Sequence, residues 1–67
     1  MDSAAVLFSF DDGVAEITLN RPDNRNSMTP DLIAGFADAM ARLLEIEAQV
    51  RCLIITGAGR GFCSGGD

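Results

Sequence analysis

The first twenty positions of the chain contain two short, largely apolar runs separated by a polar turn. In the runs AAVLFSF and VAEITL, every second residue is apolar, which gives each extended segment one apolar face. Between them, Asp12 and Gly13 supply the positive φ that a tight hairpin turn requires. The pattern predicts an antiparallel β-hairpin built from residues 4–10 and 14–19. Its shared apolar face comprises Ala4, Val6, Phe8, Phe10, Ala15, Ile17 and Leu19.

A helical period follows a polar loop, NRPDNRNSM, at residues 20–28, whose asparagines, aspartate and proline favour turns. Thr29, Pro30 and Asp31 then form a typical helix start, with a hydroxyl cap, a proline at the first helical position and an acid near the positive end of the helix dipole. We predict a helix of roughly residues 30–47 with one apolar face. That face is expected to contain Leu32, Ile33, Phe36, Met40, Leu43 and Leu44.

A third strand is predicted at residues 52–55, CLII, which are apolar without alternation. A short continuous apolar run suits a strand covered on both faces, as in a parallel sheet. The order strand, strand, helix, strand implies a right-handed crossover that places this strand parallel to the second one. Because two covering layers are needed and these residues supply one helix, we expect residues 1–67 to be the N-terminal part of one larger domain.

Charge and cysteine content argue against several classes of function. Ten acidic residues against five arginines, with no lysine or histidine, give a net charge of −5, which disfavours nucleic acid and anionic membranes as partners. No apolar run approaches the ~18 residues that cross a bilayer and no secretory signal is present, so we expect a soluble, cytoplasmic protein. Cys52 and Cys63 do not form a C-x-x-C motif and the sequence contains no histidine, so neither a metal site nor a cysteine nucleophile is expected.

Glycine makes up five of the eleven residues in GAGRGFCSGGD, residues 57–67, directly after the third predicted strand. A P-loop needs a lysine after its glycines, and the chain has none. The dinucleotide fingerprint G-x-G-x-x-G also fails, because its sixth position is Phe62 counted from Gly57 and Ser64 counted from Gly59. A nicotinamide-dependent oxidoreductase is therefore a weak alternative.

Two interpretations of this glycine segment stay open on spacing alone. In one, the glycines simply allow a tight connection between a strand and a helix. In the other, the backbone N–H groups of Gly65 and Gly66 approach a ligand, while Asp67 caps a following helix whose positive end faces the same point. Amides arranged in this way suit an oxygen atom that gains negative charge during a reaction.

Two blocks of sequence, ITLNRPDNRNSM and ITGAGRGFCSGGD, are separated by the predicted helix, and together they resemble the N-terminal part of the enoyl-CoA hydratase/isomerase (crotonase) superfamily. The resemblance covers essentially the whole chain. It implies an α/β fold, the crotonase-like spiral of ββα units, of which residues 1–67 would hold the first ββαβ portion. It also implies a homotrimer or hexamer and an acyl-CoA thioester substrate, with coenzyme A as part of the substrate and no separate cofactor.

The same resemblance implies roles for five residues. The backbone N–H of Gly66 would be the catalytic contact to the thioester oxygen, although alanine is common at this position in the family. The backbone of Ser64 would lie near the adenine of coenzyme A and Arg25 near its phosphates, while Gly65 and Asp67 would shape the same substrate-binding loop. We assign no catalytic role to the carboxylates of Asp11, Asp12, Asp31, Asp38, Glu45 and Glu47.

Enoyl-CoA hydratase, a lyase, is the activity that we expect first from this resemblance. The alternatives are another reaction of the superfamily, such as an isomerase, a hydrolase or a different lyase, or a catalytically silent member that serves as a binding or assembly subunit. The second oxyanion donor and the acid/base carboxylates of the superfamily usually lie in a segment that follows the position of Asp67.

Overall fold

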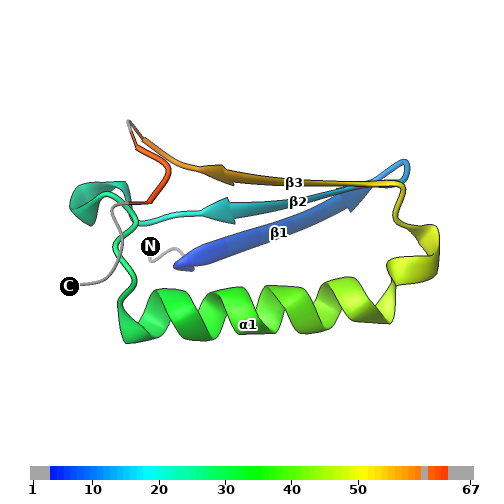
Figure 1. The fold of residues 1–67 in the computed structure, drawn as a ribbon, viewed down its shortest axis with the longest axis horizontal. Coiled ribbons are helices and arrows are strands. Elements are labelled where there is room, and N and C mark those ends of the chain that lie inside the picture. Colours follow the sequence, from blue (N-terminus) through cyan, green and yellow to red (C-terminus); the bar gives the residue numbers. More distant parts are fainter. Residues whose placement is uncertain (1–3, 60, 64–67) are drawn as a thin grey trace.

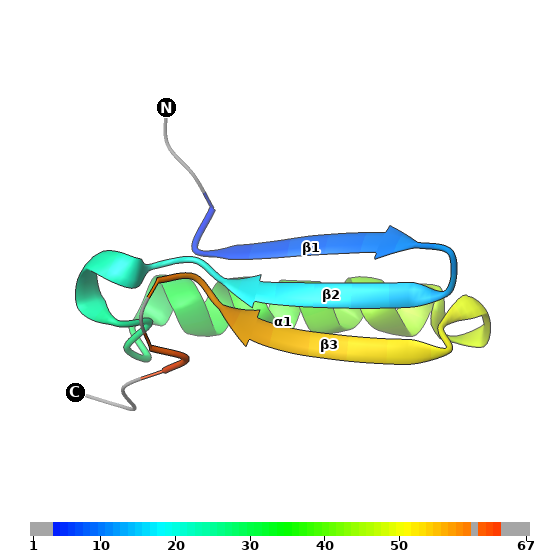
Figure 2. The same cartoon turned by 90° about the horizontal axis from the view of Figure 1, so that it is seen from above.

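A computed structural model of the chain describes residues 4–59 and 61–63. One three-stranded sheet lies against one long helix, so that the described residues form two layers (Figure 1). The elements in chain order are β1 (Val6–Asp11), β2 (Val14–Leu19), α1 (Pro30–Glu45) and β3 (Cys52–Gly57), with short 3-10 turns at Pro22–Asn24 and Glu47–Gln49. This is the predicted order of elements, and β2 lies between β1 and β3 (Figure 2).

The predicted hairpin is confirmed. Strands β1 and β2 pair in antiparallel fashion around Asp12 and Gly13, whose φ angles of 51° and 83° are both positive. A turn with two positive φ angles matches the twist of the strands that it joins, and glycine adopts the second angle without strain. The predicted apolar positions face one another across the hairpin in the pairs Val6 with Leu19, Phe8 with Ile17 and Phe10 with Ala15.

The beginning of the hairpin differs from the prediction. Strand β1 starts at Val6, Ala4 is exposed and the neighbouring Ala5 is buried with 6% of its surface exposed. The alternation therefore breaks before Val6, because the chain bends at Ala5. The Ala5 carbonyl still accepts a hydrogen bond from the Asn20 amide at 2.7 Å, just beyond the last residue of β2.

Helix α1 begins as predicted, with Thr29 at the N-cap and Pro30 at the first helical position. The hydroxyl of Thr29 donates to the carboxylate of Asp31, and its oxygen accepts no hydrogen bond from a backbone N–H of the first helical turn, so the predicted hydroxyl cap is wrong in that respect. The helix ends at Glu45, two residues before the predicted end, where the Ile46 amide turns back to the last carbonyl groups and a 3-10 turn follows.

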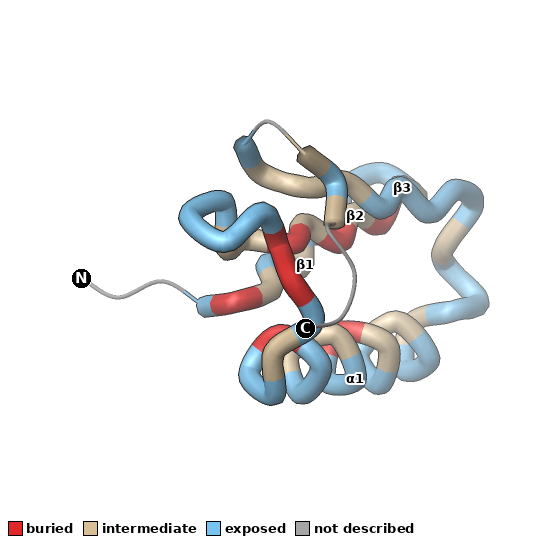
Figure 3. Tube along the Cα trace, turned by 60° about the vertical axis from the view of Figure 1, so that its left-hand side comes forward, coloured by how far each residue is buried: buried red, intermediate tan, exposed pale blue. Residues whose placement is uncertain are grey.

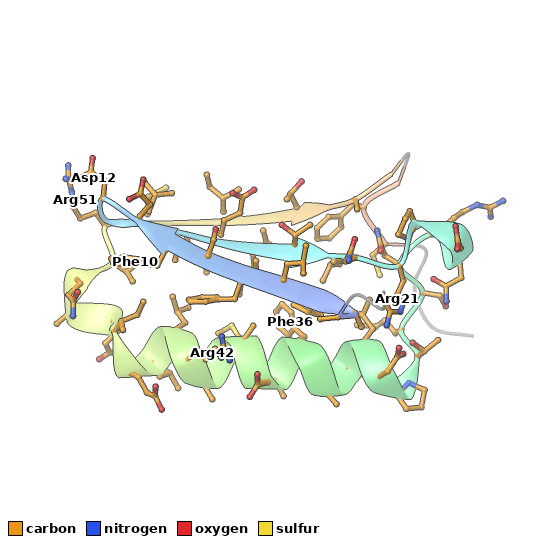
Figure 4. All side chains as sticks on the ribbon, turned by 180° about the vertical axis from the view of Figure 1, so that it is seen from behind. Phe10, Asp12, Arg21, Phe36, Arg42 and Arg51 are labelled. Carbon is orange, nitrogen blue, oxygen red and sulfur yellow. The ribbon has the colours of Figure 1, made fainter. Side chains whose placement is uncertain are left out.

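The apolar face of α1 is narrower than the sequence pattern suggested. Leu32 and Ala39 are buried, and Phe36 lies on the side of the helix that faces the sheet (Figure 4). Ile33 and Leu44, which belong to the predicted apolar face, remain 52% and 62% exposed, so the described residues do not cover this face across its full width. At about 100° of rotation per residue, these two side chains lie roughly 100° and 120° around the helix from Leu32.

Strand β3 lies parallel to β2, as predicted, in a register that runs from Val14 opposite Cys52 to Leu19 opposite Gly57. Within the described residues this strand is not covered on both faces, so the cover that its sequence predicts inside a larger domain stays a prediction. Leu53, Ile54 and Ile55 are 38–44% exposed, because α1 packs against β1 and β2 and leaves β3 open. Figure 3 shows the resulting core, with buried residues concentrated along β2 and on the facing side of α1.

Candidate functional site

The two sequence blocks meet at one end of the sheet. Because β2 and β3 are parallel, their carboxyl ends lie at the same edge, and the loops that follow them are neighbours. Loops at the carboxyl ends of parallel strands are the usual place for ligands in α/β folds. Figure 4 shows Arg21, the second residue after β2, at this edge, while Asp12 and Arg51 lie at the opposite end.

The loop after β2 is tightly wound. Its 3-10 turn ends at Arg25, which has a φ of 59° and whose amide donates to the Pro22 carbonyl at 3.1 Å. Asn26 follows with a φ of 57°, and its amide donates to the Arg21 carbonyl at 2.8 Å. Two successive residues with positive φ are uncommon outside glycine, although asparagine tolerates this conformation better than most residues.

The side chain of Asn26 joins this loop to the loop after β3 and is itself completely buried. Its Oδ1 accepts a hydrogen bond from the Arg21 amide at 2.6 Å. Its Nδ2 donates to the carbonyl oxygens of Ala58, Gly61 and Phe62 at 3.2, 3.1 and 2.9 Å. The sequence analysis did not identify Asn26 as a functional residue. In the sequence it is one of three asparagines in a polar loop, and nothing else distinguishes it.

The junction of the two loops forms a hollow of about 440 Å³ with both polar and apolar lining. Arg25 is exposed and borders this hollow together with Asp23 of its own loop and Gly59 of the glycine segment. The remaining lining residues are Pro22 and Gly61. The structure therefore brings the predicted coenzyme-binding residue Arg25 beside the glycine segment. The other four predicted site residues, Ser64, Gly65, Gly66 and Asp67, lie outside the described residues.

A second, apolar hollow of about 260 Å³ lies between the same edge of the sheet and the start of α1. Leu19, Leu32, Phe36, Ile55, Phe62 and Cys63 are among its lining residues. Cys63 is half-buried and packs against the core cluster of Ala5, Leu19 and Leu32, and its thiol is not in a disulfide. This placement agrees with a packing role for the side chain.

The carboxylate of Asp31 links the start of α1 to the loop after β2. Asp31 accepts from the Thr29 hydroxyl and forms an ion pair with Arg21, Nε to Oδ2, at 3.3 Å. The Thr29 hydroxyl, followed by Arg21, holds the pKa of Asp31 below its ordinary value of 3.8. A carboxylate that stays ionised at neutral pH is a poor proton donor.

Asp38 forms an exposed ion pair with Arg42 at 3.6 Å, one helical turn along α1.

Within residues 4–59 and 61–63, no three His, Cys, Asp or Glu side chains come together in a way that could hold a metal ion. Over the same residues, no helix combines the length and apolar character needed to span a membrane.

Residues 9–67 match the sequence profile of the enoyl-CoA hydratase/isomerase family. The chain is 42% identical over 62 residues to 1,2-epoxyphenylacetyl-CoA isomerase of Escherichia coli, a match that covers 92% of this chain and 23% of the relative. It is 50% identical over 54 residues to a probable enoyl-CoA hydratase of Mycobacterium leprae, covering 81% of this chain and 18% of that protein. The chain thus spans about a fifth of the length of these curated relatives.

Solved structures give the same result for the fold. A probable enoyl-CoA hydratase/isomerase from Mycobacterium abscessus superposes with a TM-score of 0.85 at 41% identity, covering 98% of this chain and 26% of the other. A monofunctional enoyl-CoA isomerase from M. smegmatis gives a TM-score of 0.82 at 42% identity, covering 94% of this chain and 30% of the other. The sheet and helix described above are therefore the N-terminal portion of that fold.

Proposed function

This chain belongs to the enoyl-CoA hydratase/isomerase (crotonase) family, and from that premise we propose that the complete protein is an enzyme that acts on acyl-CoA thioesters. Hydration of an enoyl-CoA is the leading reaction. The observation that supports the proposal most strongly is the meeting of the two sequence blocks, where Arg25 and the glycine segment border one hollow. A thioester with a long phosphorylated carrier needs both a cation for the carrier and amides for the carbonyl, and these come from the two blocks.

The chemistry proposed for Gly66 follows from where charge develops. When a thioester becomes an enolate or a tetrahedral adduct, negative charge collects on its oxygen atom. A backbone N–H held 2.7–3.1 Å from that oxygen stabilises the charged form more than the neutral carbonyl. Only this difference in stabilisation lowers the barrier, so a preorganised loop matters more than tight binding of the substrate.

At the coenzyme end, the proposed ligand of Arg25 is a phosphate group of coenzyme A. The arginine is exposed and borders a hollow with polar character, so it can meet a phosphate without a large desolvation cost. Asp23 borders the same hollow and lowers its positive potential, which limits the expected gain in affinity. Ser64 and Gly65 would contribute backbone contacts, and Asp67 would shape the loop.

The exposed apolar surface fits a position inside a larger domain. Leu53, Ile54 and Ile55 on β3 and Phe62 in the following loop are 38–55% exposed here. Burial of apolar surface at roughly 25 cal/mol per Å² strongly favours covering such a patch. We propose that residues 1–67 are the N-terminal part of a single crotonase-like domain, whose further residues cover β3, and that the complete protein forms a homotrimer or hexamer.

Two reactions are the main candidates for the activity of the complete protein. One similar protein is a monofunctional enoyl-CoA isomerase and another a probable enoyl-CoA hydratase, at 42% and 50% identity to this chain. The complete protein should therefore be assayed for hydration of a 2-enoyl-CoA and for isomerisation of a 3-enoyl-CoA. Turnover of neither substrate, together with no binding of coenzyme A, would contradict the proposal. Binding of a nicotinamide dinucleotide in its place would favour the oxidoreductase alternative.

The role of Arg25 has a specific test in the complete protein. Arg25→Ala should raise KM for an acyl-CoA by up to about fivefold, because one exposed ionic contact contributes ~0.2–1 kcal/mol. Arg51→Ala removes an exposed arginine at the opposite end of the sheet and is the matched control (Figure 4). With an acyl-pantetheine thioester, which lacks the nucleotide phosphates, the two variants should behave alike. An equal effect of Arg25→Ala on both substrates would contradict the phosphate contact.

A further inference from the structure

The hydrogen-bond partners around Asn26 permit only one orientation of its side-chain amide. Three carbonyl oxygens, those of Ala58, Gly61 and Phe62, lie within 3.2 Å of Nδ2, while the Arg21 amide lies 2.6 Å from Oδ1. Exchanging the amide nitrogen and oxygen would place an acceptor against three acceptors and a donor against a donor. Nδ2 has two hydrogens, so the three carbonyl oxygens share them.

These contacts cross a long stretch of chain. The three carbonyl groups lie 32 to 36 residues after Asn26, and those of Gly61 and Phe62 belong to residues three and two positions before Ser64. The side chain is completely buried, so its hydrogen bonds are shielded from competing water. A single side-chain amide therefore holds the backbone at Phe62, four residues before Gly66 in the sequence.

We propose that Asn26 is the positioning residue for the loop at residues 58–63 and, through that loop, for the amide of Gly66. The first part of this proposal, that Asn26 holds the loop, is argued from the hydrogen bonds alone. The second part, that this affects catalysis through Gly66, rests on the proposed function. Asn26 has no assigned contact with the thioester and acts only through the backbone that it holds. The hydroxyl or methyl of a smaller side chain could not reach all of these partners.

Two substitutions separate the amide from the backbone conformation. Asn26→Gly keeps a residue that accepts the φ of 57° without strain and removes all four side-chain hydrogen bonds. Asn26→Asp keeps the acceptor for Arg21 but turns an oxygen toward three carbonyl oxygens. Asn24→Ala is the matched control, because it removes one 3.4 Å hydrogen bond from the Ser27 amide within the same loop and none of the bonds to Ala58, Gly61 and Phe62.

In the complete protein, at a temperature where circular dichroism shows each variant to be folded, Asn26→Gly should lower kcat on the order of 10²-fold, with a smaller change in KM. Asn24→Ala should stay close to wild type. For Asn26→Asp, the ratio of its kcat to that of wild type should rise as the pH falls, because a protonated carboxyl regains one hydrogen to donate. A role limited to stability predicts an unchanged kcat for the folded variants and no such rise.

Hydrogen exchange separates failure of this proposal from failure of the proposed function. Exchange measured by mass spectrometry over residues 58–63 should be faster in Asn26→Gly than in wild type and unchanged in Asn24→Ala, whether or not the protein turns over an acyl-CoA. If the wild-type protein is inactive toward acyl-CoA thioesters, the proposed function fails. Hydrogen exchange then tests by itself whether Asn26 holds the loop. Unchanged exchange in Asn26→Gly, or faster exchange with an unchanged kcat, would overturn the positioning role.

Discussion

Phe62 folds back over Gly57 so closely that a Cβ atom on Gly57 would lie 2.6 Å from the Phe62 carbonyl oxygen and 2.8 Å from its Cα. Both contacts are with backbone atoms, which cannot turn aside as the end of a flexible side chain can. The same point is 3.0 Å from Nδ2 of Asn26. The last residue of β3 is therefore a glycine because the returning loop occupies the place of a side chain.

Gly57→Ala should consequently destabilise the complete protein by about 1–3 kcal/mol, the usual cost of forcing an extra methyl group into a packed site. Urea unfolding of the purified variant measures this directly. Gly61→Ala is the control, since a Cβ at Gly61 would meet no atom within 4 Å among the described residues other than its chain neighbours. We expect it to change stability by less than about 0.5 kcal/mol. Equal stability of the Gly57 variant and wild type would show that the loop does not lie over β3 as described.

A second prediction concerns the pKa of Asp31. The Thr29 hydroxyl is the largest cause of its lowered pKa, so Thr29→Val should move that pKa upward. A carboxylate with a lowered pKa in the folded state stabilises the fold above its unfolded value of 3.8. That stabilisation is lost as the pH falls through the folded pKa. The stability difference between wild type and Asp31→Asn should therefore shrink below about pH 4.

Carboxyl NMR titration of Asp31 in wild type and Thr29→Val is the direct measurement. Thr18→Val, which removes a hydroxyl on β2, serves as the control and should leave the titration of Asp31 unchanged. An identical Asp31 titration in the wild type and Thr29→Val would mean that the hydroxyl has another partner in solution.

The sequence was sufficient to predict the elements whose causes are local. The hairpin follows from alternation and from the turn at Asp12 and Gly13, and the helix start follows from Thr29 and Pro30. Parallel pairing of β3 with β2 follows from connection length and handedness. Each of these features depends on residues close together in the chain or on a general rule of topology.

Features that depend on what packs against an element could not be predicted in this way. Ile33 and Leu44 look like core residues in a helical pattern, yet they are exposed because the sheet covers only one side of α1. Asn26 looks like one more loop asparagine, and its role exists only because the loop after β3 returns beside it. The four predicted site residues from Ser64 to Asp67 remain predictions.

A third prediction concerns the isolated chain of residues 1–67. We expect this peptide to be inactive toward enoyl-CoA thioesters and poorly protected from hydrogen exchange. Leu53, Ile54 and Ile55 on the open edge strand are exposed in it. The family resemblance also leads us to expect the second oxyanion donor in a segment after Asp67, which this peptide does not include. Substantial hydration activity, or strong protection throughout a monomeric peptide, would contradict this expectation.

A fourth prediction assigns Cys63 to packing. Cys63→Ala in the complete protein should retain turnover within roughly tenfold, because nothing in the proposed mechanism uses a thiolate. A modest loss of stability is expected, since the side chain packs against Leu19 and Leu32. Cys52→Ala, at an exposed position, is the matched control. A covalent acyl adduct on Cys63 in mass spectrometry, or complete loss of activity in a folded variant, would refute the assignment.

The last prediction separates backbone from side-chain function at Gly66. If the N–H of this residue stabilises the thioester oxyanion, Gly66→Ala keeps the donor and should retain most activity, provided that φ is negative there. Gly66→Pro removes the hydrogen itself. Loss of one such donor typically costs ~2.7–4 kcal/mol, which corresponds to about 10²–10³ in kcat. Steady-state kinetics on both variants of the complete protein give the comparison.

Because proline can also distort a loop, coenzyme A affinity and thermal stability must be measured on the same two variants. The oxyanion role requires that Gly66→Pro lose far more turnover than binding or stability. A proline variant with normal turnover would leave the N–H without a catalytic role. Failure through unfolding alone would likewise point to the glycine segment as a structural connection, the interpretation that its spacing equally allows.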